Sequence, residues 1–182
     1  MLVKTFGAAV QGINATIVTI EVNVSQGIRF MHVGLPDNAV KESHERIASA
    51  LEYTGNKLPR KQIVINMAPA DIRKEGSAYD LALAIGIMAA SDSLKSDELE
   101  NYVIMGELSL DGGLQPIKGV LPIAIKAREE GFKGFILPKQ NAREAAVVNN
   151  LDVYGVESIT EVIDFFNGQS TLEPTIVNTR EE

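Results

Sequence analysis

The sequence contains no cysteine and no tryptophan, and aromatic residues make up only 5% of its 182 positions. The absence of cysteine excludes disulfides, thiol catalysis and thiolate metal sites, and it fits a reducing compartment such as the cytoplasm. With so few aromatics, the core has to be built from Val, Ile, Leu and Ala, because 45% of the residues are hydrophobic. This composition predicts one α/β domain rather than an aromatic-rich β-sandwich.

The sequence also lacks long apolar runs and an excess of positive charge. No run approaches the ~20 residues that cross a bilayer, and Lys4 and Gln11 interrupt the stretch where a signal peptide needs an apolar centre. We therefore expect a cytoplasmic protein without membrane contact. The net charge of -7 opposes a stand-alone nucleic-acid binder. Lys57, Arg60 and Lys61 form a local basic cluster, either a solvated turn or a phosphate contact.

The first half of the chain alternates between apolar and polar residues. In "TIVTIEVNVSQG" every second residue is apolar, which predicts a strand with one buried face. Together with "LVKTFGAAV" before it and "IRFMHVGL" after it, this segment predicts an antiparallel meander of three strands. Asp37 is expected to cap a helix that ends at Gly55, and "KQIVINMAP" predicts a central strand.

The second half predicts helices and strands in alternation. A helix from Ser77 to about Ala90 is apolar nearly all round, which indicates packing on more than one side. Residues 101–117 predict a hairpin with its turn at "DGG", and residues 119–131 predict a helix with Pro122 in its first turn.

The remaining segments predict a strand at "GFILP", a helix at "NAREAAVVNN" and a strand at "DVYGV". A last helix follows, with Ser158 and Glu161 placed to form a capping box. The folded domain is therefore expected to span residues 1–168. Residues 169–182 lose periodicity and predict a linker or tail.

Ser77 is the first candidate for chemistry, because a serine after a glycine at a helix start can act as a nucleophile or as a helix cap. A serine nucleophile needs a base, and Lys118 in "PIKGV" is the candidate for a Ser-Lys pair. His32 and His44 lie alone in a strand and a helix and are expected to be ordinary residues. Both roles of Ser77 stay open on spacing alone.

Asp71 and Asp80 bracket the same glycine turn, and paired acids can hold a metal or share a proton. The favoured interpretation is structural, with Asp71 in a turn and Asp80 in the first turn of a helix, where the helix dipole favours negative charge. We expect no metal and no cofactor here. The chain also has no glycine-rich phosphate-binding motif, so it cannot be an ATPase by itself.

Three long segments resemble the amino-terminal domain of the ComM/YifB family, the magnesium chelatase-related AAA+ proteins. They are "VGLPDNAVKESHERIASAL", "INMAPADIRKEGSAYDLALAIGIMAAS" and "GELSLDGGLQPIKGVLPIAIKAREEGF". The resemblance covers nearly the whole chain. It implies the ribosomal protein S5 domain 2-like fold, similar to the proteolytic domain of Lon.

The same resemblance implies that an AAA+ motor, which uses ATP and Mg²⁺ and forms a hexamer, follows this domain as its partner. The full-length protein would act on DNA as a branch-migration helicase in natural transformation. This chain would then be a non-catalytic scaffold domain that assembles with copies of itself.

The likeness to Lon implies a degenerate active site. Lon-type proteases carry K-D-G-P-S-A-G, and aligning "KEGSAYD" with it places Ala78, not Ser77, at the catalytic serine. Lon has P-I-G-G-L-K where this chain reads "PIKGVL", which places Leu121 at the catalytic lysine and Lys118 three positions early. Ser77 is therefore expected to be the helix cap. A divergent Ser-Lys hydrolase that uses Ser77 and Lys118 is the alternative.

Overall fold

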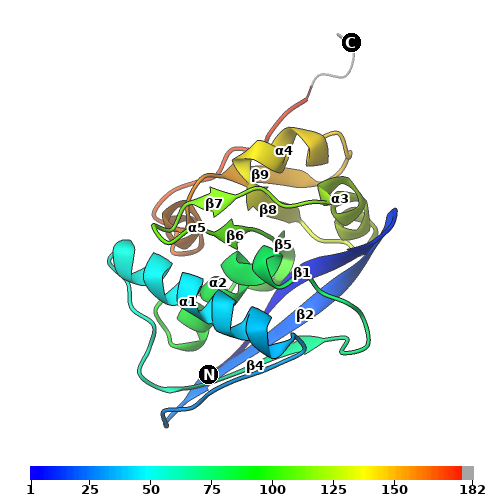
Figure 1. Ribbon diagram of the computed structural model, residues 1–182. Helices are drawn as coiled ribbons and strands as arrows, with labels where there is room; N and C mark the ends of the chain where they lie inside the picture. The colour runs from blue at the N-terminus through cyan, green and yellow to red at the C-terminus, as the bar shows by residue number, and fades with distance from the viewer. Residues whose placement is uncertain (178–182) are drawn as a thin grey trace.

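The computed structural model describes residues 1–177, and within them a mixed sheet of seven strands forms the centre of the molecule (Figure 1). The strand order is β3-β4-β2-β1-β5-β8-β9. The strands are β1 (Leu2–Gln11), β2 (Asn14–Ser25), β3 (Phe30–Val33), β4 (Gln62–Ala68), β5 (Tyr102–Ile104), β8 (Gly134–Pro138) and β9 (Asp152–Val156). A small separate ladder joins β6 (Glu107–Leu108) to β7 (Leu114–Gln115).

Five α-helices and two short 3₁₀-helices pack around this sheet within residues 1–177. The α-helices are α1 (Asp37–Tyr53), α2 (Asp80–Ala90), α3 (Val120–Glu129), α4 (Lys139–Ala145) and α5 (Ile159–Phe166). The 3₁₀-helices are η1 (Gly76–Tyr79) and η2 (Leu99–Asn101). The α/β class expected from composition is confirmed, whereas the assignment to the S5 domain 2-like fold stays a prediction.

The N-terminal part of the sheet begins with the long antiparallel hairpin β1–β2, closed by a two-residue turn in which Gly12 has φ +64°. Alternation in β2 gives the predicted buried face, because its inward residues Val18, Ile20 and Val22 are completely buried. The predicted three-stranded meander is wrong. β4 lies between β2 and β3, and β3 pairs with β4 in parallel, because α1 carries the chain back across the sheet between these two strands.

The C-terminal part of the sheet is parallel, with β5, β8 and β9 connected through α3 and α4. It meets the N-terminal part at a single pair in register, Phe6 of β1 opposite Val103 of β5. The predicted hairpin over 101–117 is confirmed for β6 and β7, but β5 belongs to the main sheet. Gly106, with φ +159°, lies between these two pairings.

Neighbouring residues of the strands face opposite layers of helices. The Thr5 hydroxyl donates to the Ala82 carbonyl of α2, whereas the Phe6 ring packs on Phe132, just after α3, with ring centres 5.3 Å apart. α2 and α3 therefore cover opposite faces of β1. Similarly, Tyr154 of β9 packs on Phe165 of α5, while the following Gly155 faces α4.

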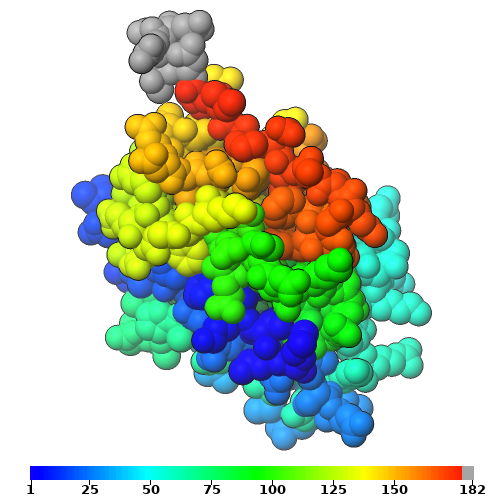
Figure 2. Space-filling view, turned by 180° about the vertical axis from the view of Figure 1, so that it is seen from behind, coloured from blue at the N-terminus to red at the C-terminus, as the bar shows by residue number. Residues whose placement is uncertain are grey.

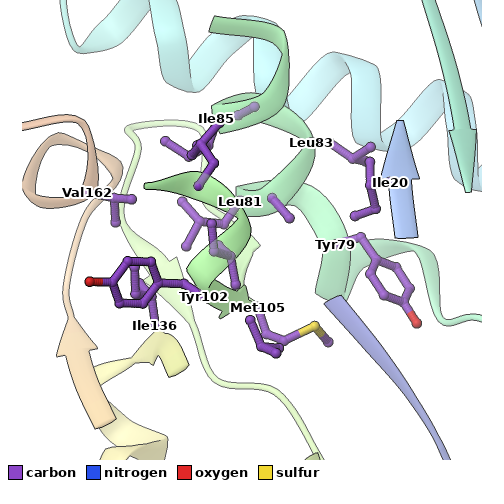
Figure 3. Close-up of a cluster of buried hydrophobic side chains, with 14 of the residues drawn as sticks. Ile20, Tyr79, Leu81, Leu83, Ile85, Tyr102, Met105, Ile136 and Val162 are labelled. Carbon is purple, nitrogen blue, oxygen red and sulfur yellow. The ribbon is translucent and has the colours of Figure 1, made fainter. Parts of the chain in front are cut away.

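Helix α2 is the centre of the core, and each of its residues from Asp80 to Ala90 is buried. Figure 3 shows its side chains Leu81 and Ile85 beside Val162 of α5, with Ile136 and Tyr102 from the sheet close by. The nearly all-apolar sequence of this segment predicted packing on more than one side, and the structure confirms it.

The helix caps are partly as expected. Ser158 and Glu161 form the predicted capping box at α5. Asp37 is not the cap of α1, because the N-cap is Pro36 and Asp37 is the first helical residue. Pro122 is the third residue of α3, in its first turn as predicted.

Residues 171–177 have no regular secondary structure and lie at the surface (red in Figure 2). The Thr175 amide donates to the Val153 carbonyl of β9 over 2.7 Å. The linker or tail expected over 169–182 stays a prediction, and its last five residues lie outside the described part. None of the helices within residues 1–177 combines the length and the hydrophobicity needed to cross a membrane.

Candidate functional site

A cavity of about 460 Å³ lies where the end of β1, η1 and the start of α3 meet. Residues 8–11 of β1 form one wall, and Ala78 lies on the wall that η1 provides. Lys118, immediately before α3, lines the same cavity, and Arg73 and Glu75 add two more charges. The fold therefore brings together the two segments whose sequences resemble the catalytic motifs of Lon.

The two residues that the resemblance assigns to the Lon dyad positions, Ala78 and Leu121, do not meet in this cavity. Ala78, at the position of the nucleophile, lines it. Leu121, at the position of the lysine, is not among its lining residues and is 36% exposed. Lys118 does line the cavity, but Ser77 does not. At Ala78 the cavity wall carries a methyl group, which cannot act as the nucleophile of an acyl transfer.

Ser77 is not the cap of α2, contrary to expectation. It is the second residue of η1, and α2 begins at Asp80 with Tyr79 as an N-cap that makes no side-chain capping bond. The Leu81 amide donates instead to the Gly106 carbonyl over 3.1 Å, and the Gly106 amide donates to the Ala78 carbonyl over 2.9 Å. A free amide in the first turn of α2 is therefore satisfied by a carbonyl from a distant segment and not by the side chain of a nearby serine.

Hydrogen bonds connect the cavity walls that β1 and η1 provide. The Tyr79 hydroxyl donates to the Ala8 carbonyl over 3.0 Å, and the Ala8 amide donates to the sulfur of Met105 over 3.3 Å. Burial raises the pKa of the Tyr79 phenol, so this hydroxyl keeps its proton. At the other wall, Gly119 has φ +74°, and a Cβ there would lie 2.7 Å from a methyl carbon of Val10.

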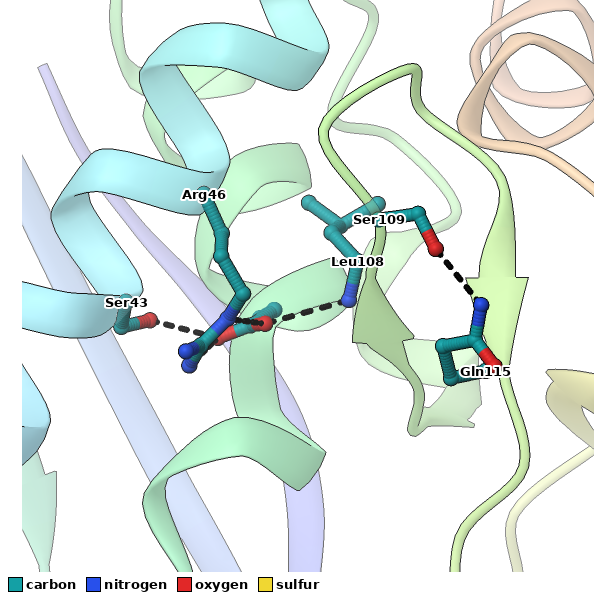
Figure 4. Close-up of polar contacts among 6 residues, drawn as sticks. Ser43, Arg46, Leu108, Ser109 and Gln115 are labelled. Atoms are coloured by element: carbon teal, nitrogen blue, oxygen red, sulfur yellow. Dashed lines mark hydrogen bonds and ion pairs between the residues drawn. The ribbon is translucent and has the colours of Figure 1, made fainter.

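Asp80 lies outside the cavity, as the completely buried first residue of α2. Its carboxylate accepts hydrogen bonds from Ser43 Oγ (2.6 Å), Arg46 Nε (2.6 Å), Arg46 Nη2 (3.1 Å) and the Leu108 amide (3.1 Å), as Figure 4 shows for the labelled donors. Burial raises the pKa of the Asp80 carboxyl, whereas Arg46, Ser43 and the amide act to lower it. The hydrogen bond to Asp80 raises the pKa of Arg46.

This arrangement favours the structural interpretation of Asp80 over a paired-acid site. Asp71, the other acid, is an exposed loop residue. Within residues 1–177 there is no group of three or more His, Cys, Asp or Glu side chains that could hold a metal ion. Ser43 and Arg46 are not among the residues predicted from the sequence, although a single acid in an otherwise apolar helix already indicates a buried partner of opposite charge.

The other predicted residues lie away from the cavity. Lys57, Arg60 and Lys61 are exposed in the loop between α1 and β4, and Lys57 and Arg60 line the same hollow as the acidic Glu52.

The two histidines also lie outside the cavity. His32 Nε2 lies 3.1 Å from the sulfur of Met67, and burial lowers the pKa of His32 to about 4. The His44 ring packs on Phe30, with ring centres 4.4 Å apart.

Comparison with known proteins places this chain in a family. Residues 20–141 match the family model described as subunit ChlI of Mg-chelatase. The chain is 42% identical to the competence protein ComM of Haemophilus influenzae and 39% identical to YifB of Escherichia coli, over 94% and 91% of its length. It spans about a third of the length of these relatives, 34% and 33%.

The likeness to Lon also appears in these comparisons. The chain is 32% identical to Lon protease 2 of Bacillus subtilis over 68% of its own length and 22% of that protein. The chain therefore belongs to the family of the ChlI subunit of Mg-chelatase, in which its relatives include ComM and YifB, and it is also similar to Lon.

Proposed function

We propose that this chain is a non-catalytic scaffold domain of a ComM/YifB-like AAA+ ATPase. The observation that carries the proposal is that Ala78, which the resemblance aligns with the nucleophile of Lon, lines the cavity, while Leu121, which it aligns with the lysine, lies outside. Catalysis requires reacting groups within about an ångström of their productive positions. A methyl group and a displaced isobutyl group cannot supply an attacking oxygen and a base.

The proposal includes a division of labour within a longer protein. A motor domain beyond this chain would bind ATP and Mg²⁺, assemble as a hexamer and act on DNA by branch migration. The present domain would position the ring by contact with the motor and with its own copies. Support comes from the family membership and from the short span of the chain relative to ComM and YifB.

The test compares the full-length protein with a form that lacks residues 1–168. We expect the shortened form to lose the hexamer in analytical ultracentrifugation with ATP, and to lose branch migration on a four-way DNA junction. A separate measurement of ATP hydrolysis shows whether the motor itself is folded. An unchanged hexamer together with unchanged branch migration would remove the scaffold role.

A contribution of this domain to DNA binding rests on Lys57, Arg60 and Lys61, which are exposed on one loop. Changing all three to Glu should lower the affinity of the full-length protein for single-stranded DNA and reduce its salt dependence. The matched control changes Lys4, Lys95 and Arg143, exposed cations outside this loop, to Glu. Equal effects of the two triple variants would show that net charge alone is responsible.

A divergent Ser-Lys hydrolase is the second candidate, favoured by the position of Lys118 on the cavity wall and of Ser77 next to Ala78. A serine-directed fluorophosphonate probe decides between them. The scaffold proposal expects equal labelling of the wild type and the Ser77→Ala variant. A covalent adduct located on Ser77 by mass spectrometry, and lost in Lys118→Met, would establish the hydrolase instead.

A further inference from the structure

The cavity beside Ala78 is bordered by an open edge of β1. β1 pairs with β2 along its whole length, but with β5 at Phe6 only. β5 ends at Ile104, one residue after the position opposite Phe6. The last residues of β1 therefore have no neighbouring strand on that side. These residues, 8–11, are the ones that line the cavity.

The direction of the backbone groups follows from the alternation of an antiparallel pair. The Ala8 amide donates to Met105, and the Ala8 carbonyl accepts from Tyr79, so both groups of Ala8 point away from β2. Val10, two residues further along the strand, has the same orientation. Within residues 1–177 no partner outside the β1–β2 ladder bonds to the amide or the carbonyl of Val10. Val10 therefore presents a donor and an acceptor to the cavity.

The position of these groups is fixed. Gly119 approaches Val10 so closely that a Cβ would lie 2.7 Å from its side chain, and Tyr79 holds Ala8 from the opposite wall. An unpaired donor and acceptor on a fixed, extended strand form the template to which an extended peptide adds as a further strand.

The charges on the walls select among extended peptides. Arg73 and Lys118 line the cavity and are opposed by a single acid, Glu75, on a protein whose net charge is -7. The other lining residues are mixed, with the apolar Ala9, Ala78 and Ile123 beside the polar Gln11.

We propose that this cavity binds an extended peptide segment that pairs with the main chain of Val10 and carries acidic side chains toward Lys118 and Arg73. This binding role goes beyond the scaffold function and does not depend on assembly. The cavity would then hold a peptide without cutting it, because Ala78 offers no nucleophile. A free carboxylate or phosphate ion could use the same cations, but it would not need the open strand edge. The experiment separates the two.

The experiment measures binding of a fluorescein-labelled, end-blocked peptide of alternating valine and glutamate to the 182-residue chain by fluorescence polarisation. We expect saturable binding that weakens with salt, and little binding of the matched valine-lysine peptide. In ¹⁵N-resolved NMR spectra the amide signals of Val10 and Gly119 should shift on titration, while the amide of Lys57 should not.

Val10→Pro is the decisive variant, because proline removes the amide that faces the cavity and leaves the bonds to β2 in place. We expect about threefold to tenfold weaker binding, the range for one lost hydrogen bond. Leu2→Pro is the matched control, since Leu2 has the same orientation at the opposite end of β1. Lys118→Glu, at an exposed position, should weaken binding about fivefold and does not depend on the fold tolerating proline.

Three outcomes would overturn the proposal. The acidic peptide does not bind saturably, or it binds Val10→Pro and Lys118→Glu as tightly as the wild type. In the third outcome acetate or inorganic phosphate displaces the peptide completely and shifts the same amides, which would identify a site for small anions. Each of these results leaves the scaffold proposal standing, because assembly of the full-length protein is measured separately.

Discussion

Arg46 provides the sharpest test of what holds the core together. Asp80 is completely buried, and Arg46 supplies two of its four hydrogen bonds. Replacing Arg46 with Met keeps most of the aliphatic volume but leaves the carboxylate with Ser43 and the Leu108 amide alone. An unpaired buried charge of this kind costs about 3–5 kcal/mol.

Asp80→Ala should be less harmful, although it removes the acceptor for every one of these donors. The Arg46 side chain is 22% exposed and can turn to water, so the main loss is the unsatisfied Leu108 amide, worth about 1–3 kcal/mol. The double variant, Arg46→Met with Asp80→Ala, should therefore be about as stable as Asp80→Ala alone and more stable than Arg46→Met alone.

The pH dependence has a defined sign. Removing Arg46 takes away an influence that lowers the pKa of Asp80, so burial raises this pKa further. An acid whose pKa is raised in the folded state contributes stability at low pH, and this contribution is lost as the pH rises through the folded pKa. The deficit of Arg46→Met relative to the wild type should therefore be larger at about pH 8 than at about pH 5.

The assay is urea unfolding, followed by circular dichroism, of the wild type, both single variants and the double variant at these two pH values. Ser43→Ala serves as a milder variant, because it removes one hydrogen bond to the same carboxylate. A smaller loss of stability in Arg46→Met than in Asp80→Ala, or simple addition of the two single effects in the double variant, would show that Arg46 does not compensate a buried charge on Asp80.

Three further predictions concern stability. Burial lowers the pKa of His32 from 6.5 to about 4, so the stability present above about pH 6.5 should fall by about 3 kcal/mol as the pH drops through this window, and His32→Gln should flatten that part of a pH-dependent unfolding curve. Gly119→Ala should lower the free energy of unfolding by about 2 kcal/mol in urea, because the backbone of this residue is in the left-handed region and a Cβ would collide with Val10. An unchanged stability would show that the start of α3 can move. Ser158→Ala should cost about 1 kcal/mol by loss of the α5 capping box, measured as a lower thermal midpoint.

Local patterns in the sequence predicted local structure well. The alternation in β2 and the Ser158 capping box depend on residues close together in the chain, so their chemistry can be read directly. The place of β3 could not be predicted, because pairing with β4 depends on a crossover through α1. The strand pattern of residues 28–35 is the same whether its neighbour is β2 or β4.

In the candidate site too, contacts between residues far apart in the sequence are the ones that could not be predicted. The resemblance to Lon predicted a degenerate site around Ala78, and the structure places Ala78 and Lys118 on one cavity. The lone acid in α2 indicates a buried partner but not which residue it is, because Arg46 lies 34 residues away on another helix. The predicted capping role of Ser77 is wrong for the same physical reason. The Leu81 amide donates its hydrogen bond to the carbonyl of Gly106, which lies in a loop distant in the sequence.

The single pair in register between β1 and β5 has a mechanical consequence for the molecule. Backbone hydrogen bonds within the sheet join the two parts at this one place, so much of the remaining contact between them comes from helices such as α2 and α3, which pack on both. Under a force applied across the strands, we expect β1 and β5 to separate before the strands within either part of the sheet separate.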